Sequence, residues 1–151
     1  AYGLATPAGQ GVDAKQAQRY RDFGERMGRL FQVRDDYLDY YGDARTNGKD
    51  LYQDFRRGLI THPIIVLRNK VKATERRELA RLWKDDELRA EARGLDRFLE
   101  ISGGSRIQSL LVREIETEVH ALMHFVREHP DSEYRERILE HLGTLLVPQI
   151  V

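Results

Sequence analysis

Proline, the strongest helix breaker, occurs at only four positions of the chain, 7, 63, 130 and 148. The long stretches between these positions are therefore free to form helices. Apolar residues recur at steps of three and four over residues 13–41 and 105–129, which is the spacing of one buried helix face. No run alternates apolar and polar residues in the manner of a half-buried strand. The sequence therefore predicts an all-α helical bundle.

The composition narrows the choice of partners. Of the 151 residues, 25 are basic and 25 acidic, so the net charge is zero and predicts neither a nucleic-acid nor a membrane-surface partner. No apolar run is long enough for a membrane span. Without cysteine, disulfides and thiolate metal sites are excluded. We expect a cytoplasmic location and, because the chain begins with Ala in mid-pattern, a fragment or trimmed product.

The first long helix is expected over residues 13–41, with Asp13 as its N-cap. Gly24 and Gly28 lie inside this helix, and each costs up to ~1 kcal/mol relative to Ala. Close packing against a neighbouring helix is the expected compensation at these two positions.

Shorter helices are expected over residues 50–57, from 61 onward, and over 75–83, 86–101, 105–129 and 133–146. Gly58 ends the first of these, and Pro63 lies in the first turn of the second. The apolar run 64–67 predicts that this second helix is deeply buried. Thr74 and Asp85 are the expected N-caps of the next two.

The chemistry is concentrated where the first helix ends. Asp35 and Asp39 lie four residues apart, which places them about 40° apart on one helix face. Asp36 adds a third acid. Like charges four residues apart, as at Asp35 and Asp39, destabilise a helix. Acids beside apolar residues need a cationic partner, and Mg²⁺ with a phosphate-bearing substrate fits them. Lys49, Arg56, Arg57 and Thr61 follow closely. The alternative is a row of solvated surface acids.

The full spacing is more informative than the acids alone. It reads Phe31-Gln32-x-x-Asp35-Asp36-x-x-Asp39-x-x-Gly42-Asp43-x4-Gly48-Lys49-x4-Asp54-x3-Gly58-x2-Thr61-x-Pro63. This pattern resembles the second aspartate-rich region of the trans-isoprenyl diphosphate synthases, the polyprenyl synthetase family that includes farnesyl and geranylgeranyl diphosphate synthases. The resemblance implies that residues 1–151 form the C-terminal part of an isoprenoid synthase fold.

The resemblance also implies an activity: Mg²⁺-dependent condensation of an allylic diphosphate with isopentenyl diphosphate. Asp35 then resembles the direct metal ligand, and Lys49 the lysine that holds the allylic diphosphate. Phe31 and Gln32 resemble the pair that lines the substrate pocket, and Thr61 offers polar support. Three further acids resemble outer-shell metal groups acting through bound water: Asp36, Asp39 and Asp54.

Two departures from the family pattern put activity in question. The family usually has a lysine that helps to hold the diphosphate where this chain has Leu59, and a glycine near the bulky pair Leu51-Tyr52. The first aspartate-rich motif of the family is also absent, because Asp85-Asp86-Glu87 reads as helix capping. We therefore expect the 151 residues to be inactive alone. The resemblance implies a homodimer, or a complementing N-terminal half as partner.

Other interpretations stay open. The chain could be a non-catalytic or heteromeric subunit of a prenyl synthase, or a helical binding module whose acids are surface decoration. Glu116, His120 and His124 have a spacing that suits zinc, although an ordinary helix face is the simpler interpretation. The Tyr40-Tyr41 pair lines a prenyl cavity or belongs to the core, and His62 is interpreted as a packing or solvent-facing residue.

Overall fold

A computed structural model describes residues 13–43, 50–103 and 106–146. Within these ranges the regular elements are helices, so the all-α prediction is confirmed. The chain divides into two compact units, residues 1–34 with 113–151 and residues 35–112. Among the described residues, no helix has the length and apolar character that crossing a membrane requires.

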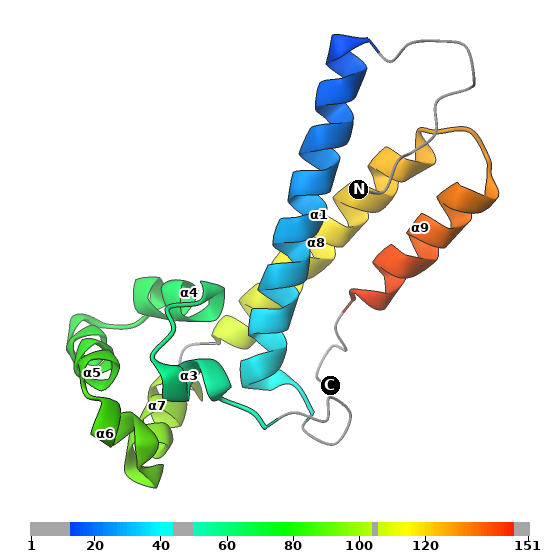
Figure 1. The fold of residues 1–151 in the computed structure, drawn as a ribbon. Coiled ribbons are helices and arrows are strands. Elements are labelled where there is room, and N and C mark those ends of the chain that lie inside the picture. The colour runs from blue at the N-terminus through cyan, green and yellow to red at the C-terminus, as the bar shows by residue number, and fades with distance from the viewer. Residues whose placement is uncertain (1–12, 44–49, 104–105, 147–151) are drawn as a thin grey trace. The chain divides into compact units, whose positions relative to one another are not determined.

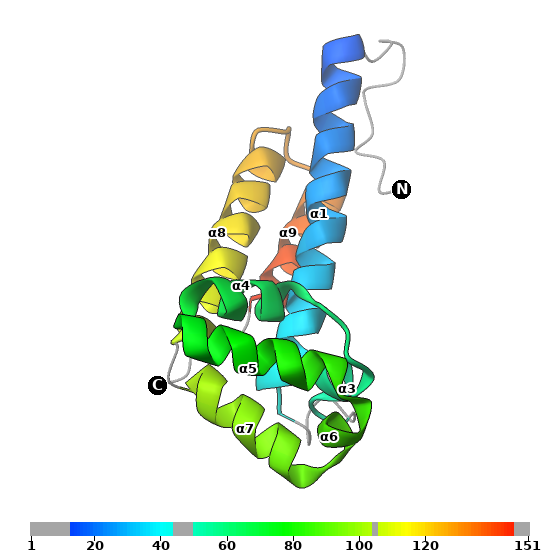
Figure 2. The same cartoon turned by 90° about the vertical axis from the view of Figure 1, so that its left-hand side faces the viewer.

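The first unit is built on three helices, which Figures 1 and 2 show side by side. They are the first part of α1 (Ala14–Tyr41), most of α8 (Ile107–Arg127), and α9 (Glu133–Thr144). As predicted, Asp13 caps α1, since its carboxylate accepts a hydrogen bond from the Gln16 amide at 2.7 Å. The rings of Phe23 and Phe125 stack at 5.0 Å between α1 and α8. The apolar faces of the three helices form the core of this unit.

The prediction of close packing at Gly24 and Gly28 is wrong for the part of the chain that the structure describes. Both glycines are exposed, and a methyl group added at either would meet no atom within 4 Å. The apolar stripe turns Phe23, Met27 and Leu30 inward, which leaves these two glycines on the outer face of α1.

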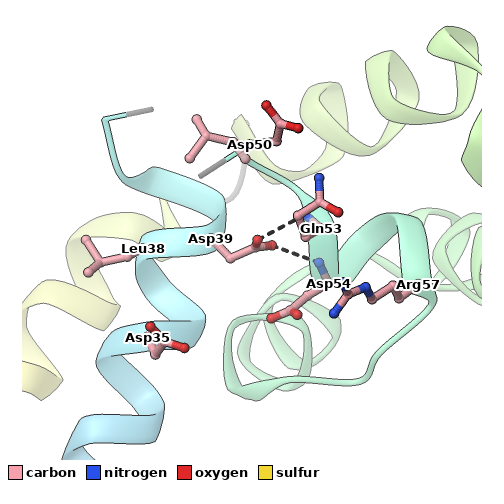
Figure 3. A pocket seen from close by; sticks show the side chains of 8 residues that line it. Asp35, Leu38, Asp39, Asp50, Gln53, Asp54 and Arg57 are labelled. Atoms are coloured by element: carbon pink, nitrogen blue, oxygen red, sulfur yellow. Dashed lines mark hydrogen bonds between the residues drawn. The ribbon is translucent and has the colours of Figure 1, made fainter. Parts of the chain in front are cut away.

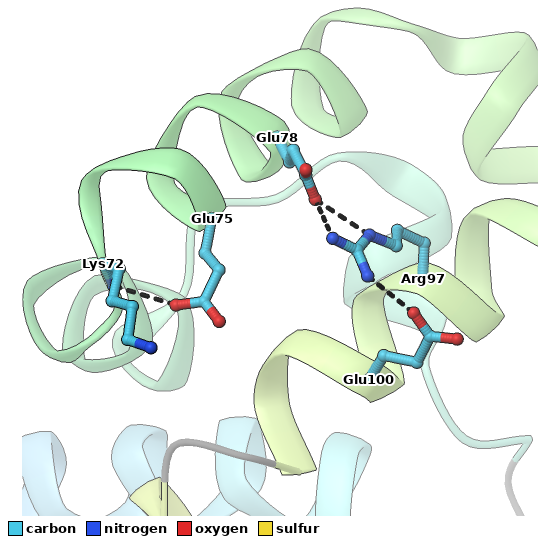
Figure 4. A network of polar contacts seen from close by, with 5 residues as sticks. All are labelled: Lys72, Glu75, Glu78, Arg97 and Glu100. Atoms are coloured by element: carbon cyan, nitrogen blue, oxygen red, sulfur yellow. Dashed lines mark hydrogen bonds and ion pairs between the residues drawn. The ribbon is translucent and has the colours of Figure 1, made fainter.

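The second unit contains the end of α1, the start of α8 and five shorter helices between them. These are α3 (Gln53–Arg57), α4 (His62–Lys70), α5 (Ala73–Lys84), α6 (Asp86–Ala90) and α7 (Ala92–Gly103). Its aromatic core stacks Phe55 on Phe98 at 4.8 Å, with Trp83 against both rings. Outside this core, Arg97 on α7 pairs with Glu78 on α5 and with Glu100, which ties the two helices together (Figure 4).

Several predicted boundaries are corrected. The helix expected over 50–57 begins only at Gln53, because Tyr52 adopts a left-handed conformation with φ 63°. Lys72 rather than Thr74 precedes α5. The helix from 61 onward is buried on one face only, since Ile65 is 47% exposed. Its start was predicted correctly, as was the closure of α3 at Gly58 with φ 68°.

The helix expected over 86–101 is interrupted. Asp85 caps it as predicted, accepting the Leu88 amide at 2.9 Å, but Glu91 is extended with ψ 150° and separates α6 from α7. The chain folds back so tightly there that a Cβ on Gly94 would lie 2.0 Å from the Leu88 carbonyl oxygen. Gly94 therefore permits a close approach between two backbones that no other residue could make.

Candidate functional site

An open pocket of about 550 Å³ lies in the second unit, between the end of α1 and α3 (Figure 3). We call it the acid pocket. Acidic side chains dominate its described lining, which also includes one basic residue. The lining residues are Asp35, Leu38, Asp39, Asp50, Leu51, Gln53, Asp54 and Arg57. Asp35, Asp39 and Asp54, which the sequence singled out, thus meet in one cavity.

Asp39 holds the start of α3. Its two carboxylate oxygens accept hydrogen bonds from the backbone amides of Gln53 and Asp54, each at 3.0 Å (Figure 3). Its backbone carbonyl accepts a third bond, from the Tyr52 amide at 2.8 Å. The first amides of a helix have no partner within that helix, and Tyr52 provides no side-chain cap. Asp39 therefore caps α3 from a different helix.

Asp36 plays the corresponding part for α4. Its side chain is buried, with 6% of its surface exposed, and it accepts a hydrogen bond from the His62 amide at 3.2 Å. His62 is the first residue of α4, and the preceding Thr61 makes no side-chain cap. A carboxylate at the N-terminus of a helix is also favoured by the helix dipole. Two of the motif's acids are thus engaged in positioning the elements that follow.

Asp35 and Asp54 are the motif's acids that line the pocket without capping a helix. The exposed carboxylate of Asp35 makes no hydrogen bond or ion pair within the described residues. Partial burial raises the pKa of Asp54, and the neighbouring carboxylates of Asp39, Asp36 and Asp35 raise it further, whereas Arg57 lowers it. Carboxylates that repel one another in this way favour a bound cation. Hard oxygen ligands of this kind suit Mg²⁺.

The other end of α3 lies against a buried arginine. The Arg89 guanidinium pairs with Asp86 and donates to the Leu82 carbonyl at 2.8 Å. It lies against Gly58, where an added Cβ would come within 2.6 Å of Nη2. Gly58 is therefore required both for its positive φ and for its lack of a side chain. The short helix α3 is capped at its start by Asp39, and the residue that ends it, Gly58, packs against Arg89.

Two hydroxyl groups beside the acids are buried without a hydrogen bond of normal geometry, those of Tyr40 and Thr61. Burial raises the pKa of Tyr40; the nearby Thr61 hydroxyl opposes this shift, and the charges of Asp54, Asp39 and Asp36 add to it. The Tyr40 hydroxyl therefore keeps its proton. Thr61, which was predicted to bind substrate, does not line the acid pocket.

The other predicted site residues are placed differently. Phe31 and Gln32 belong to the first unit, where the ring of Phe31 lies 5.4 Å from that of His141 and Gln32 is exposed. Lys49 lies outside the described residues. Leu59, at the position of the family's lysine, is 46% exposed and does not line the acid pocket. Its carbonyl accepts a hydrogen bond from the Trp83 indole at 3.2 Å.

Asp50, Gln53 and Arg57 line the acid pocket although the motif did not assign them a role. For Arg57 the signal was its place among the basic residues that follow the acids. Asp50 and Gln53 carried no signal of their own, because their place depends on where α3 begins.

Of the two interpretations offered for Tyr40 and Tyr41, the core interpretation is confirmed for Tyr40. Tyr40 is buried, with 3% of its surface exposed, and both rings line a second cavity of about 250 Å³ in the same unit. Tyr52 and Phe98 contribute to its wall, and Arg106 lies at its edge with a positive φ of 52°. Tyr40 is thus part of the core, whereas Tyr41 is partly buried, and both line this cavity.

The spacing that suited zinc gains no support. His120 and His124 are exposed on α8, and His124 lies 3.4 Å from the carboxylate of Glu128. Over the described ranges, no three side chains of the metal-binding types come close enough to hold an ion by themselves. A cation in the acid pocket would therefore need ligands from water or substrate as well, which is usual for Mg²⁺.

The chain is similar to known proteins over the region that contains the acid pocket. The family described as polyprenyl synthetase matches residues 4–96, more than half of the chain. Solanesyl diphosphate synthase 3 of Arabidopsis thaliana is 31% identical over 96 residues, which is 64% of this chain and 21% of that protein. Geranylfarnesyl diphosphate synthase of Aeropyrum pernix is 37% identical over 78 residues, or 52% of this chain and 23% of that protein.

A longer alignment reaches further along the chain. Octaprenyl diphosphate synthase of Haemophilus influenzae is 22% identical over 137 residues, which is 91% of this chain. The matched region is 41% of that protein's length. The chain therefore spans well under half of each of these three relatives.

Proposed function

The chain belongs to the polyprenyl synthetase family, and we propose that its acid pocket is the diphosphate-binding half of a Mg²⁺-dependent prenyltransferase site. In the proposed reaction the allylic C–O bond breaks and pyrophosphate leaves. A new C–C bond forms to isopentenyl diphosphate, which then loses a proton. The product is a longer polyprenyl diphosphate.

The observation that carries this proposal is that the four acids make different contacts. Asp36 and Asp39 accept backbone amides, whereas Asp35 makes no such bond within the described residues and Asp54 is crowded by other carboxylates. Asp35 and Asp54 are therefore the residues that would hold Mg²⁺. Asp36 and Asp39 would contribute by holding the helices α4 and α3 in place. When bound, Mg²⁺ supplies Lewis-acid neutralisation of the leaving diphosphate.

The chain's own residues then act by binding and positioning. Asp39 and Asp36 keep the starts of α3 and α4 in place, and so orient Asp54 at the pocket wall. The remaining roles are proposed from the family pattern. Lys49 binds the allylic diphosphate, Phe31 and Gln32 line the substrate pocket, and Thr61 gives polar support.

The first acid-rich motif is missing from these 151 residues, so we propose that they need a complementing N-terminal half to turn over substrate. A homodimer and a cytoplasmic location are part of the same proposal. The departures at Leu51-Tyr52 and Leu59 favour the second candidate, a non-catalytic subunit with the same fold.

A thermal-shift experiment tests the binding half of the proposal. Mg²⁺ together with inorganic pyrophosphate should raise the Tm of the chain, because a ligand that binds only the folded state stabilises it. Asp35→Ala should abolish the shift without lowering the Tm of the free protein. No shift in the wild-type chain would instead support a binding module with surface acids.

An activity assay separates the enzyme from the non-catalytic subunit. The chain is supplied with an N-terminal half that carries the first acid-rich motif, together with an allylic diphosphate and isopentenyl diphosphate. Chain elongation that depends on Asp35 supports the enzyme. Retained pyrophosphate binding without elongation supports the subunit.

A further inference from the structure

We propose that Arg57 binds the phosphate oxygens of the diphosphate in the acid pocket and supplies there the positive charge that Leu59 cannot. The inference rests on the proposed function and extends it, since the family pattern gives position 57 no role. It names a binding residue that distinguishes a metal–diphosphate complex from a bare cation.

The guanidinium of Arg57 lies beside the acids of the pocket. Arg57 is exposed, lines the acid pocket, and in Figure 3 extends along α3 toward Asp54. Even so, its side chain makes no ion pair or hydrogen bond with any described residue. In the same unit Arg89, Arg93 and Arg97 pair with acids, whereas the described side chains of Arg56, Arg68 and Arg81 have no such pair either. Arg57 differs from these three in lining the acid pocket. A guanidinium beside carboxylates but unpaired keeps its donors for a ligand.

The acid pocket contains both acidic side chains and a basic one. Asp35 and Asp54 attract a cation, but Arg57 opposes the binding of a cation that arrives alone. A divalent cation carrying a diphosphate satisfies both groups, because its metal faces the carboxylates while its phosphate oxygens face the guanidinium. The planar fork of arginine matches phosphate oxygens through two parallel hydrogen bonds.

The helix that carries Arg57 is anchored near both of its ends. Arg57 is the last residue of α3, whose start is held by Asp39 and whose end lies against Arg89. These contacts position the backbone of Arg57 beside the acid pocket. Leu59 lies beyond Gly58, outside the pocket lining.

Arg56 provides a matched control. It is the neighbouring residue in the last turn of α3, it is also an exposed arginine, and it does not line the acid pocket. Arg56→Leu and Arg57→Leu therefore remove the same charge from the same helix end. Any general effect of net charge or of the helix dipole is shared by both variants.

The experiment is calorimetric titration of the 151-residue chain, first with MgCl₂ alone and then with inorganic pyrophosphate in excess Mg²⁺. Arg57→Leu should weaken pyrophosphate binding by about tenfold, which corresponds to the loss of one charge-assisted contact. The same variant should leave binding of Mg²⁺ alone unchanged or tighter. Arg57→Lys should retain part of the affinity, because it keeps the charge but not the fork. Arg56→Leu should bind both as the wild type does.

The outcomes distinguish the inference from its premise. Equal pyrophosphate affinity in wild type, Arg57→Leu and Arg56→Leu, together with loss in Asp35→Asn, would overturn the role of Arg57 and leave the proposed function standing. Equal weakening in the two leucine variants would also overturn it, since the effect would then be one of net charge. If wild type binds no pyrophosphate with Mg²⁺, both the inference and the proposed function fail.

Discussion

The carboxylate of Asp39 accepts the backbone amide of Asp54 at 3.0 Å, so one acid of the motif fixes the helix that carries another. Acids that recur at a fixed spacing are readily interpreted as a set of equivalent ligands. Here Asp36 and Asp39 are engaged by helix amides, whereas Asp35 and Asp54 face the acid pocket. The difference gives each acid a distinct expected response to mutation.

Asp39→Ala should lower the free energy of unfolding by about 1–3 kcal/mol, because two amides at the start of α3 lose a charged acceptor. Urea titration followed by circular dichroism measures this. Asp35→Ala is the control and should change stability by less than about 0.5 kcal/mol, since that carboxylate makes no hydrogen bond within the described residues. Equal losses in the two variants would contradict the distinction between them.

The pH dependence of stability should carry a contribution from Asp54. Its pKa is raised in the folded state from an ordinary value of 3.8, so the folded protein binds this proton more tightly than the unfolded chain does. The contribution of Asp54 is therefore favourable at acid pH and is lost as the pH rises from 3.8 through the raised pKa. Asp54→Asn should flatten the decline of Tm over that window. Saturating Mg²⁺ should also flatten it in the wild type, because a bound cation favours the carboxylate.

Tyr40→Phe should leave the free energy of unfolding unchanged or increase it by up to about 1 kcal/mol, because the lost hydroxyl is buried without a hydrogen bond of normal geometry. Tyr37→Phe is the matched control. Its hydroxyl accepts the Gln108 side-chain amide at 3.4 Å, so its removal should be neutral or destabilising. A marked loss of stability in Tyr40→Phe would show that the hydroxyl has a partner in solution. Chemical denaturation of both variants under one condition gives the comparison.

Gly24→Ala and Gly28→Ala should each stabilise the protein by up to ~1 kcal/mol, because both sites lie in a helix with open space around them. Gly94→Ala should destabilise it, since its Cβ would collide with the Leu88 carbonyl. Thermal melts of the three variants test the contrast. If either α1 variant loses stability or self-association, that face of α1 is covered in solution and the expectation fails.

Much of the fold was accessible from local patterns. The capping roles of Asp13 and Asp85, the end of α3 at Gly58 and the start of α4 beside Pro63 all depend on residues within one turn of the boundary. The break at Glu91 could not be predicted in this way. It depends on the contact between Gly94 and the Leu88 carbonyl, which exists only once α6 and α7 have folded back on one another.

The candidate site, like the fold, was predictable from the sequence only in part. The family motif placed Asp35, Asp39 and Asp54 in one functional group, and the acid pocket brings these three together. It could not tell which of them would be used by helix amides, because that depends on where α3 begins. Tyr52 moves that start from the expected residue 50 to Gln53, and only then do two amides face Asp39.

The sequence by itself determined the helical class, the family and the identity of the acids, because apolar periodicity, caps and motif spacing are properties of neighbouring residues. The tertiary structure alone decided which acids support helices, which remain for a ligand, and that Arg57 enters the pocket while Leu59 does not. Those outcomes depend on distances between elements, and a hydrogen bond of 3.0 Å between residues 14 or 15 positions apart leaves no periodic trace in the chain.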